Sequence, residues 1–249
     1  MKVLGIDIGG TGIKGAVVNT KTGELLTERF RIPTPKPATP KAVAKVVKQM
    51  VNHFEWKKAV GCCFPTIIVD GKCKHKGNLS EEWINVNVEK LFKKESDGNP
   101  FYVSNDADLA GVAEINLGAG KGVKGKVFVI TIGTGIGSGL FYNGKLIPNV
   151  ELGHIYHTNG EIIEKFCADS VRKKEGLSLE DWAKRFDIFL NHVKVLHTPS
   201  MYILGGGISK KFDQFKQHLT VDIPVEAARF KNNAGIIGAA IYASKKNKK

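Results

Sequence analysis

The chain has 249 residues, of which 42% are hydrophobic, and this composition is typical of a folded globular protein. Its formal net charge is +13, with 37 Lys and Arg residues against 24 Asp and Glu residues. Such an excess favours a polyanionic partner such as nucleic acid, an anionic membrane or polyphosphate, although the basic end Lys245–Lys249 contributes part of it. No apolar run reaches the ~18 residues that a membrane helix needs, so we expect no membrane partner.

The start of the chain and its cysteines predict a cytoplasmic protein. Met1-Lys2 leads directly into a predicted strand, without the pattern of a signal peptide. The cysteines show no paired-ligand spacing, and two of them are adjacent on a predicted buried strand, where we expect small core residues rather than a disulfide. The four cysteines are Cys62, Cys63, Cys73 and Cys167.

In the first half of the chain, the pattern predicts three strands within residues 1–32, followed by a proline-rich connector at 31–40. Thr39 is expected to cap a helix that continues with apolar residues at helical spacing to Phe54. The elements predicted after it are a buried strand at 59–64, a hairpin at 67–74, a helix at 86–94, a strand at 101–104 and a helix at 106–117.

The second half repeats this order. Asn143-Gly144 is a hairpin signal between two of its strands. The predicted strands are 126–132, 139–142, a third ending at Ile147, and 201–204; the predicted helices are 161–174, 178–196, 209–218 and 234–243.

Two glycine-rich turns, about half a chain apart, are the most informative feature of the sequence. The first turn, Gly9-Gly10-Thr11-Gly12, follows the apolar strand that ends at Ile8, and the second, Gly133-Thr134-Gly135, follows the strand that ends at Ile132. Glycines let backbone N–H groups approach phosphate oxygens closely, and successive N–H groups form an anion-binding nest. Because a second strand follows each turn, the repeat indicates a duplicated α/β domain with two phosphate-binding hairpins.

Two other glycine patterns do not support the function that their letters suggest. Gly10–Gly15 matches the dinucleotide-binding fingerprint, but that fingerprint must open a helix, and here the β-branched run Ala16–Val18 follows. Gly118–Lys121 resembles part of a P-loop, but Ile115 occupies the position of its first glycine and Gly122 that of its Ser or Thr.

Polar residues at a predicted strand–helix junction are candidates for catalysis. Asn105 and Asp106 follow the strand at 101–104. Asn105 can cap the helix, and Asp106 can at the same time accept a proton from a hydroxyl group. Glu151 and His154 flank a glycine and offer two further polar side chains, whereas His157 lacks the paired cysteines of a zinc cluster.

The segments GIDIGGTGIKG, SNDAD, TIGTGIGSG, ELGH and ILGGG, in this order, resemble the motifs of the ROK sugar kinases of the actin–hexokinase superfamily. The similarity covers nearly the whole chain and is greatest to the polyphosphate-dependent glucokinases, on the segments RIPTPKPATP, PNVELGH and KKEGLSLEDW. The resemblance implies an α/β fold of two RNase H-like (actin-like ATPase) domains around a central cleft. We expect an N-terminal domain at 1–109, completed by a helix at 234–249, and a C-terminal domain at 110–233.

The resemblance further implies phosphoryl transfer from inorganic polyphosphate, with ATP as a second donor, to the 6-hydroxyl of glucose. Asp106 would be the general base, and Asp7 would orient Mg²⁺ through water. The residues that would bind the sugar are Asn78, Asn105, Glu151, His154 and Glu164. The residues that would bind phosphate are Gly9, Gly10, Thr11, Gly12, Lys14, Gly133, Thr134, Gly135, and the adenosine-side turn Gly205, Gly206 and Gly207.

The sequence departs from the usual family pattern after its Glu-x-Gly-His segment. Typical members continue with a Cys-rich zinc site, whereas Ile155–Gly160 follows here, so we expect no zinc. ROK repressors carry an N-terminal DNA-binding helix pair, whereas this chain begins with its phosphate strand, so we expect no nucleic-acid partner. The expected assembly is a homodimer that binds glucose and polyphosphate.

Three alternatives stay open. The nearest is a strictly ATP-dependent glucokinase or glucomannokinase; a nucleic-acid-binding protein is suggested by charge alone, and a non-catalytic sugar sensor would bind glucose without turnover. A long polyphosphate also needs a basic track, and the sequence leaves open which basic residues share a face. The candidates for this track are Lys14, Lys121, Lys124, Arg172, Lys173 and Lys174.

Overall fold

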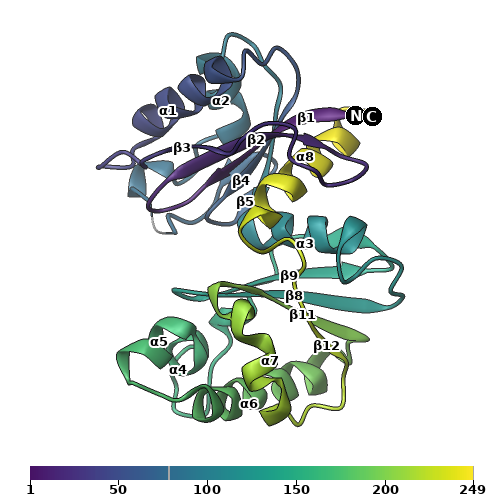
Figure 1. Ribbon diagram of the computed structural model, residues 1–249. Coiled ribbons are helices and arrows are strands. Elements are labelled where there is room, and N and C mark those ends of the chain that lie inside the picture. Colours follow the sequence, from purple (N-terminus) through teal and green to yellow (C-terminus); the bar gives the residue numbers. More distant parts are fainter. Residues whose placement is uncertain (78, 249) are drawn as a thin grey trace. The chain divides into compact units, whose positions relative to one another are not determined.

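The computed structural model describes residues 1–77 and 79–248. The chain forms two compact units (Figure 1): unit 1 comprises Met1–Ala113 with Asn233–Lys249, and unit 2 comprises Glu114–Asn232. The division falls inside helix α3 (Asp106–Leu117), which therefore contributes to both units. In the part of the chain that the structure describes, no helix is long and apolar enough to cross a membrane.

Unit 1 is built on a five-stranded sheet with the strand order β3-β2-β1-β4-β7. The first three strands form an antiparallel meander, and β4 and β7 add to it in parallel with β1. The strands of unit 1 are β1 (Lys2–Ile8), β2 (Ile13–Asn19), β3 (Phe30–Ile32), β4 (Val60–Phe64) and β7 (Phe101–Asn105), with the small hairpin β5 (Ile68–Val69) and β6 (Lys72–Cys73).

Helices cover both faces of this sheet. Helices α1 (Pro40–His53) and α2 (Val88–Glu95) lie on one face, and α8 (Ala234–Lys246) lies on the other (Figure 1). Successive residues of a strand point to opposite faces of the sheet, and Gly5 of β1 and Gly15 of β2 mark the two faces. A Cβ added at Gly5 would meet Ile236 of α8, whereas one added at Gly15 would lie 2.9 Å from the sulfur of Met50 in α1. Thr39 caps α1 as predicted, since its side chain accepts a hydrogen bond from the Ala42 N–H.

Helix α8 approaches the sheet backbone unusually closely. A Cβ added at Gly5 or Gly61 would collide with backbone oxygens of α8, and one added at Gly238 would collide with the carbonyl of Leu109 in α3. The helix is therefore held by backbone-to-backbone contact through glycines on both sides. Through this contact the C-terminal segment Asn233–Lys249 packs as part of unit 1.

Unit 2 repeats the topology of unit 1. Its sheet has the order β10-β9-β8-β11-β12, with the same antiparallel meander and the same two parallel strands. The predicted duplication of the strand–turn–strand unit is thus present in the structure (Figure 1). The strands of unit 2 are β8 (Lys126–Ile132), β9 (Ile136–Tyr142), β10 (Lys145–Ile147), β11 (Met201–Gly206) and β12 (Val225–Ala227).

Two predicted helices of unit 2 are broken in the structure. The helix expected at 161–174 is replaced by α4 (Glu164–Cys167) and α5 (Asp169–Lys174), because Ala168 between them adopts an extended conformation with ψ of 157°. The helix expected at 209–218 is mostly 3₁₀, with α7 (Phe212–Phe215) as its only α-helical part. The long helix α6 (Leu179–His197) lies within two residues of its predicted bounds.

We predict that Gly61→Ala lowers the free energy of unfolding by about 1–3 kcal/mol, because the added methyl group would force α8 away from β4. Chemical denaturation of the purified variant measures this change. Gly10→Ala is the matched control, because a Cβ at Gly10 meets no atom within 4 Å. Equal unfolding free energies for the two variants would show that α8 adapts without cost.

Candidate functional site

The first glycine turn is braced by the segment that follows β3. The Gly9 N–H donates to the Gly12 carbonyl at 3.1 Å, which closes the turn. The Thr34 hydroxyl donates to the Gly9 carbonyl at 2.5 Å, and the Arg31 guanidinium donates through Nη2 to the Thr11 carbonyl at 2.8 Å. Neither Thr34 nor Arg31 was a predicted site residue, because their contact with the turn depends on the register of β3.

Asp7 lies one residue before the end of β1, beside this turn. Its carboxylate is 3.6 Å from the Lys14 ammonium group. Burial raises the pKa of Asp7, and the nearby charges of Lys14 and Arg29 oppose that rise. Helix α8 begins against this carboxylate, since a Cβ added at Gly235 would lie 3.3 Å from the Asp7 Cγ. The Cys63 thiol donates to the Gly235 carbonyl at 3.1 Å and fixes that end of α8.

The four cysteines are buried and unpaired, as their spacing predicted. Burial raises the pKa of the Cys62 and Cys63 thiols well above the ordinary value. Since the thiolate is the reactive form, these side chains are core residues rather than nucleophiles.

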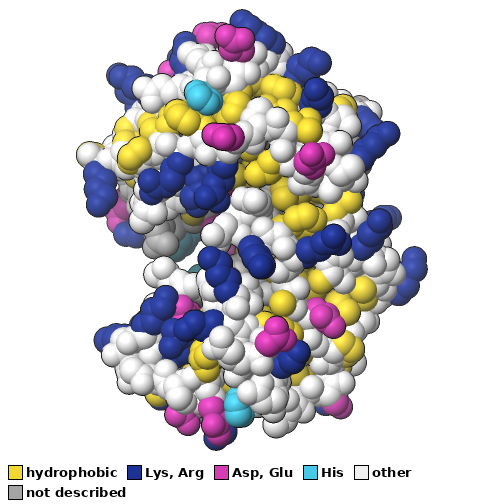
Figure 2. Space-filling view, viewed as in Figure 1, with side chains coloured by type: hydrophobic (Ala, Val, Ile, Leu, Met, Phe, Trp, Pro, Cys, Tyr) yellow, Lys and Arg dark blue, Asp and Glu magenta, His cyan; other side chains and the backbone are white. Residues whose placement is uncertain are grey.

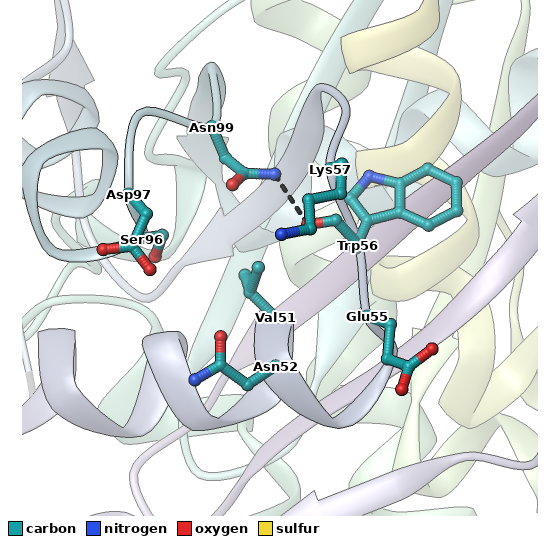
Figure 3. Close-up of a pocket in the computed structure, with 8 residues that line it drawn as sticks. All are labelled: Val51, Asn52, Glu55, Trp56, Lys57, Ser96, Asp97 and Asn99. Carbon is teal, nitrogen blue, oxygen red and sulfur yellow. Dashed lines mark hydrogen bonds between the residues drawn. The ribbon is translucent and has the colours of Figure 1, made fainter.

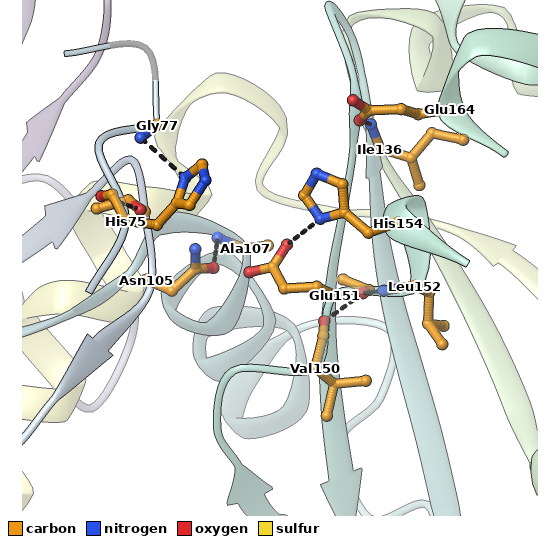
Figure 4. Close-up of polar contacts among 12 residues, drawn as sticks. His75, Gly77, Asn105, Ala107, Ile136, Val150, Glu151, Leu152, His154 and Glu164 are labelled. Atoms are coloured by element: carbon orange, nitrogen blue, oxygen red, sulfur yellow. Dashed lines mark hydrogen bonds and ion pairs between the residues drawn. The ribbon is translucent and has the colours of Figure 1, made fainter. Parts of the chain in front are cut away.

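Asn105 and Asp106 take up the dual arrangement that their sequence allows. The buried Asn105 ends β7, and its Oδ1 accepts hydrogen bonds from the N–H groups of Ala107 at 2.8 Å and Asp108 at 3.2 Å (Figure 4), so it caps α3. Asp106 is exposed, and its Oδ1 also accepts from the Ala107 N–H at 2.8 Å. A carboxylate at the carboxyl end of a parallel strand and the start of a helix is well placed to act on a bound hydroxyl.

Asn78 lies outside the described residues, and hydrogen bonds fix the loop segment His75–Gly77 that precedes it in the sequence. The Thr66 hydroxyl donates to the His75 carbonyl at 2.6 Å, and the Gly77 N–H donates to Nδ1 of His75 at 3.2 Å (Figure 4). Gly77 has a φ of +55°, and a Cβ there would collide with the Pro65 carbonyl. The Phe64-Pro65-Thr66 segment thus positions this loop, a role that sequence reasoning did not assign to Thr66.

In unit 2, Glu164 and helix α5 hold the second glycine turn. The Gly133 N–H donates to the Gly135 carbonyl at 3.0 Å, and Oε2 of Glu164 accepts from the Ile136 N–H at 3.0 Å (Figure 4). Ser170, at the start of α5, donates its N–H to the Gly133 carbonyl and its hydroxyl to the Thr134 carbonyl. Glu164 therefore supports the turn directly.

His154 ends a short 3₁₀ segment (Leu152–His154) that Glu151 immediately precedes, and Ser138 of β9 positions this segment. The Ser138 hydroxyl donates to the Val150 carbonyl at 2.5 Å and accepts from the Leu152 N–H at 2.9 Å. Nδ1 of His154 lies 3.8 Å from the Glu151 carboxylate (Figure 4). The buried Ser138, which follows the second turn in the sequence, is thus a positioning residue that sequence reasoning missed.

The third glycine cluster, Gly205–Gly207, lies beside the second turn at the carboxyl ends of the strands. Gly206 pairs with Ile132, the residue immediately before the second turn, and has a φ of +80°. A Cβ at Gly206 would collide with the Ile132 backbone, and the Ser209 hydroxyl donates to the Gly206 carbonyl at 2.8 Å. Unit 2 therefore gathers Gly133–Gly135 and Gly205–Gly207 at the carboxyl ends of two parallel strands.

Among the described residues, no group of three or more His, Cys, Asp and Glu side chains could hold a metal ion. His157 stacks on Phe166 with ring centroids 4.2 Å apart. Mg²⁺ typically binds through one or two carboxylates together with waters and substrate phosphates. The carboxylate of Asp7, which lies beside the first glycine turn, fits that mode of binding.

The predicted basic-track residues differ in how far their charge is compensated. The buried Asp169 accepts hydrogen bonds from Arg172 and Lys173, each at 2.7 Å. Burial acts to raise the pKa of Asp169, but the hydrogen bonds and positive charges of Lys173 and Arg172 together outweigh it and lower the pKa. Lys121 and Lys124 are exposed, and Lys and Arg side chains are spread over the visible face of both units (Figure 2).

Unit 1 has a cavity of about 490 Å³, whose lining residues are shown in Figure 3. It lies at the end of the sheet opposite to the first glycine turn. Its lining comes from the last turn of α1 and from the segments that follow α1 and α2, including Trp56, Asp97 and Asn99. These segments lead into the amino ends of β4 and β7. Ligands of open α/β sheets bind outside the carboxyl ends of the strands, so this cavity is separate from the candidate site.

Comparison with known proteins agrees with these features. The ROK family pattern matches residues 3–169. The polyphosphate glucokinase of Mycobacterium tuberculosis is 41% identical over 237 residues, which cover 95% of this chain and 89% of that protein.

The crystal structure of the inorganic polyphosphate/ATP-glucomannokinase from Arthrobacter sp. strain KM matches with a TM-score of 0.92 and 43% identity, covering 98% of this chain and 99% of that one. A ROK family glucokinase from Streptomyces griseus, in complex with glucose and AMPPNP, shares the fold, with a TM-score of 0.84 at 22% identity over 98% of this chain and 100% of that one. On the extent of these matches, the chain belongs to the ROK family.

Proposed function

We propose that the protein transfers a phosphoryl group from inorganic polyphosphate, and also from ATP, to the 6-hydroxyl of glucose. The observation that carries the proposal is 43% identity over 98% of the chain to a polyphosphate/ATP-glucomannokinase. The residues required by this chemistry are present: two glycine turns, a carboxylate at a strand end and polar side chains for a sugar.

Asp106 is the general base of the proposed reaction. It accepts the proton of the 6-hydroxyl while that oxygen forms a bond to the terminal phosphorus atom, and the shortened polyphosphate leaves with the electrons of the broken P–O bond. The residues proposed to bind the sugar hydroxyls are Asn78, Asn105, Glu151 and His154. Glu164 is also a proposed sugar ligand, but one of its carboxylate oxygens already accepts a hydrogen bond from the Ile136 N–H beside the second turn.

The glycine turns bind the phosphates of the donor. Backbone N–H groups of Gly9–Gly12 and Gly133–Gly135 supply hydrogen-bond donors without long side chains that would need to be ordered. Lys14 adds a positive charge at the first turn, and Gly205–Gly207 adds a further backbone surface in unit 2.

Asp7 holds Mg²⁺ through water in this proposal. When bound there, the ion would supply positive charge that offsets part of the negative charge of the donor phosphates. The remaining work, which is to orient the donor and the sugar and to accept the proton, belongs to the side chains and turns described above.

The alternative activities are separated by the donor and acceptor used. A strictly ATP-dependent glucokinase would show no turnover with polyphosphate, and a sugar sensor would show none with either donor. The Arthrobacter protein is a glucomannokinase, which makes mannose the second acceptor to assay. The expected homodimer stays a prediction, to be measured by analytical ultracentrifugation.

We predict that Asp106→Asn lowers kcat by roughly two to four orders of magnitude, because the amide cannot accept the proton. Glucose binding, measured by calorimetry, should change little. Asp97→Asn is the control, since Asp97 is exposed and pairs with Lys48 beside the separate cavity. Near-normal turnover by a folded Asp106→Asn protein would rule out Asp106 as the base.

We predict that activity requires Mg²⁺ and that the purified protein contains no stoichiometric zinc. Removal of divalent ions with EDTA should abolish turnover, and added Mg²⁺ should restore it, because the phosphates of the donor carry clustered negative charge. Elemental analysis of the freshly purified protein measures zinc. One zinc per chain would contradict the prediction and point to His154 or His157.

We predict that polyphosphate is preferred over ATP, and that the KM for polyphosphate rises more steeply with ionic strength. A long polyanion meets more cationic side chains than ATP does, and salt screens each of those contacts. Coupled assays of glucose 6-phosphate formation, with each donor at low and moderate salt, test both statements. Turnover with ATP and none with polyphosphate would refute the donor preference and leave the sugar kinase intact.

A further inference from the structure

A row of charged side chains crosses the first sheet beside the first glycine turn. In the strand register, Asp7 of β1 pairs with Lys14 of β2, and Lys14 pairs with Arg31 of β3. Residues that are paired in this way point to the same face of a sheet. The row therefore runs from the interior strand β1 to the edge strand β3, next to Gly9–Gly12.

This row carries more positive than negative charge. Lys14 and Arg31 are neighbours of like sign, an arrangement that destabilises a sheet unless an anion lies between or above them. Among the described residues, the Asp7 carboxylate is the acidic partner of Lys14, at 3.6 Å. No ion pair joins Arg31 to an acidic side chain in the part of the chain that the structure describes.

Arg31 is held in place by the turn rather than by an acid. It is exposed, and its Nη2 donates to the Thr11 carbonyl at 2.8 Å. A Cβ at Gly12 would lie 2.6 Å from Nε and 2.7 Å from Nη2 of Arg31, so a larger residue 12 would displace the guanidinium from this position. One hydrogen bond to the turn leaves most of the N–H groups of the fork for a ligand.

The contrast with unit 2 supports a role in binding an anion. Arg172 and Lys173 share the buried carboxylate of Asp169, which compensates their charge locally. Arg31 has no such partner within the described residues, although it lies against a turn of the phosphate-binding type. Of these three cations, Arg31 is the one that is exposed, hydrogen-bonded to a glycine turn and without an acidic partner among the described residues.

We propose that Arg31 is a donor-binding residue that, with Lys14, directs a polyphosphate chain from the first glycine turn toward the β3 edge of the sheet. The inference rests on the proposed function. The planar guanidinium can hydrogen-bond two oxygens of one phosphate, and the ammonium group of Lys14 contacts the preceding one. ATP ends in a nucleoside after three phosphates, so it gains less from a cation farther along the chain.

The competing explanation is that Arg31 only braces the turn through the Thr11 carbonyl. A bracing residue would affect both donors equally, because both need the turn. A chain-binding residue would affect the longer donor more. The ratio of the two KM changes therefore separates the two roles.

The test compares Arg31→Gln with wild type in steady-state assays with long-chain polyphosphate and with ATP. We expect the KM for polyphosphate to rise about tenfold, as for loss of one exposed charge-assisted hydrogen bond, and the KM for ATP to rise less than about threefold. The kcat and the KM for glucose should stay the same. The slope of log KM against log salt for polyphosphate should fall by about one, as it does when one phosphate contact is lost from a polyanion complex.

Two further variants complete the experiment. Arg31→Lys should restore most of the affinity for polyphosphate, because it retains the charge. Lys2→Gln, at the other end of β1 from the turn, removes one exposed charge from the same unit and should leave both KM values unchanged. Equal KM increases for both donors in Arg31→Gln, or no increase for either, would overturn the proposal.

A binding measurement keeps this inference distinct from the proposed activity. Calorimetric titration of the wild type and of Arg31→Gln with long-chain polyphosphate and with tripolyphosphate, without glucose, needs no turnover. We expect Arg31→Gln to lose affinity for the long chain and to lose less for tripolyphosphate. If the wild type binds polyphosphate but phosphorylates no sugar, the proposed activity fails alone; if Arg31→Gln binds polyphosphate as wild type does, the inference about Arg31 fails alone.

Discussion

The close backbone contact of α8 with β1 and β4 is the constraint on which the first half of the site depends. Gly5, Gly61 and Gly238 remove the side chains that would separate the helix from the strands and from α3. The helix can then begin at Gly235, against the Asp7 carboxylate. Sheet, helix and carboxylate are fixed together, so the position of Asp7 depends on residues more than two hundred positions later in the chain.

The duplicated topology explains why the two glycine turns resemble each other and why their surroundings differ. Both sheets have the same order of strands, so each turn lies at the carboxyl end of its central parallel strand. The first turn is supported from β3 and its connector, by Arg31 and Thr34. The second is supported from α4 and α5, by Glu164 and Ser170. The first turn is thus contacted by the cationic side chain of Arg31, and the strand that follows the second turn by the carboxylate of Glu164.

Most of the fold could be predicted because its signals are local. Apolar alternation, glycine turns and the cap at Thr39 identify elements from neighbouring residues alone, and the strands and the long helix α6 lie close to where these signals place them. The break at Ala168 had no local signal. Two residues after the break, Ser170 bonds to the second turn, and no local pattern can signal such a contact between segments far apart in the sequence.

The same distinction applies to the candidate site. Asn105 could be recognised as a cap because the hydrogen bonds that define a cap lie within three residues. Thr34 and Ser138 could not, because the carbonyl groups that they satisfy become neighbours only through strand register and loop packing. A sequence therefore identifies the residues that carry chemistry more readily than those that position them.

The charge of the chain shows how composition and structure answer different questions. A formal charge of +13 indicates a polyanionic partner without locating it. The structure divides the cations by their partners: Arg172 and Lys173 share Asp169, whereas Arg31 lies beside a phosphate-type turn and has no acidic partner among the described residues. Arg172 and Lys173 each lie 2.7 Å from Asp169 and would have to give up that contact to bind a phosphate closely, whereas Lys14 lies farther, 3.6 Å, from Asp7. The binding path of an anionic donor is therefore better inferred from uncompensated, ordered cations than from the density of Lys and Arg on the surface.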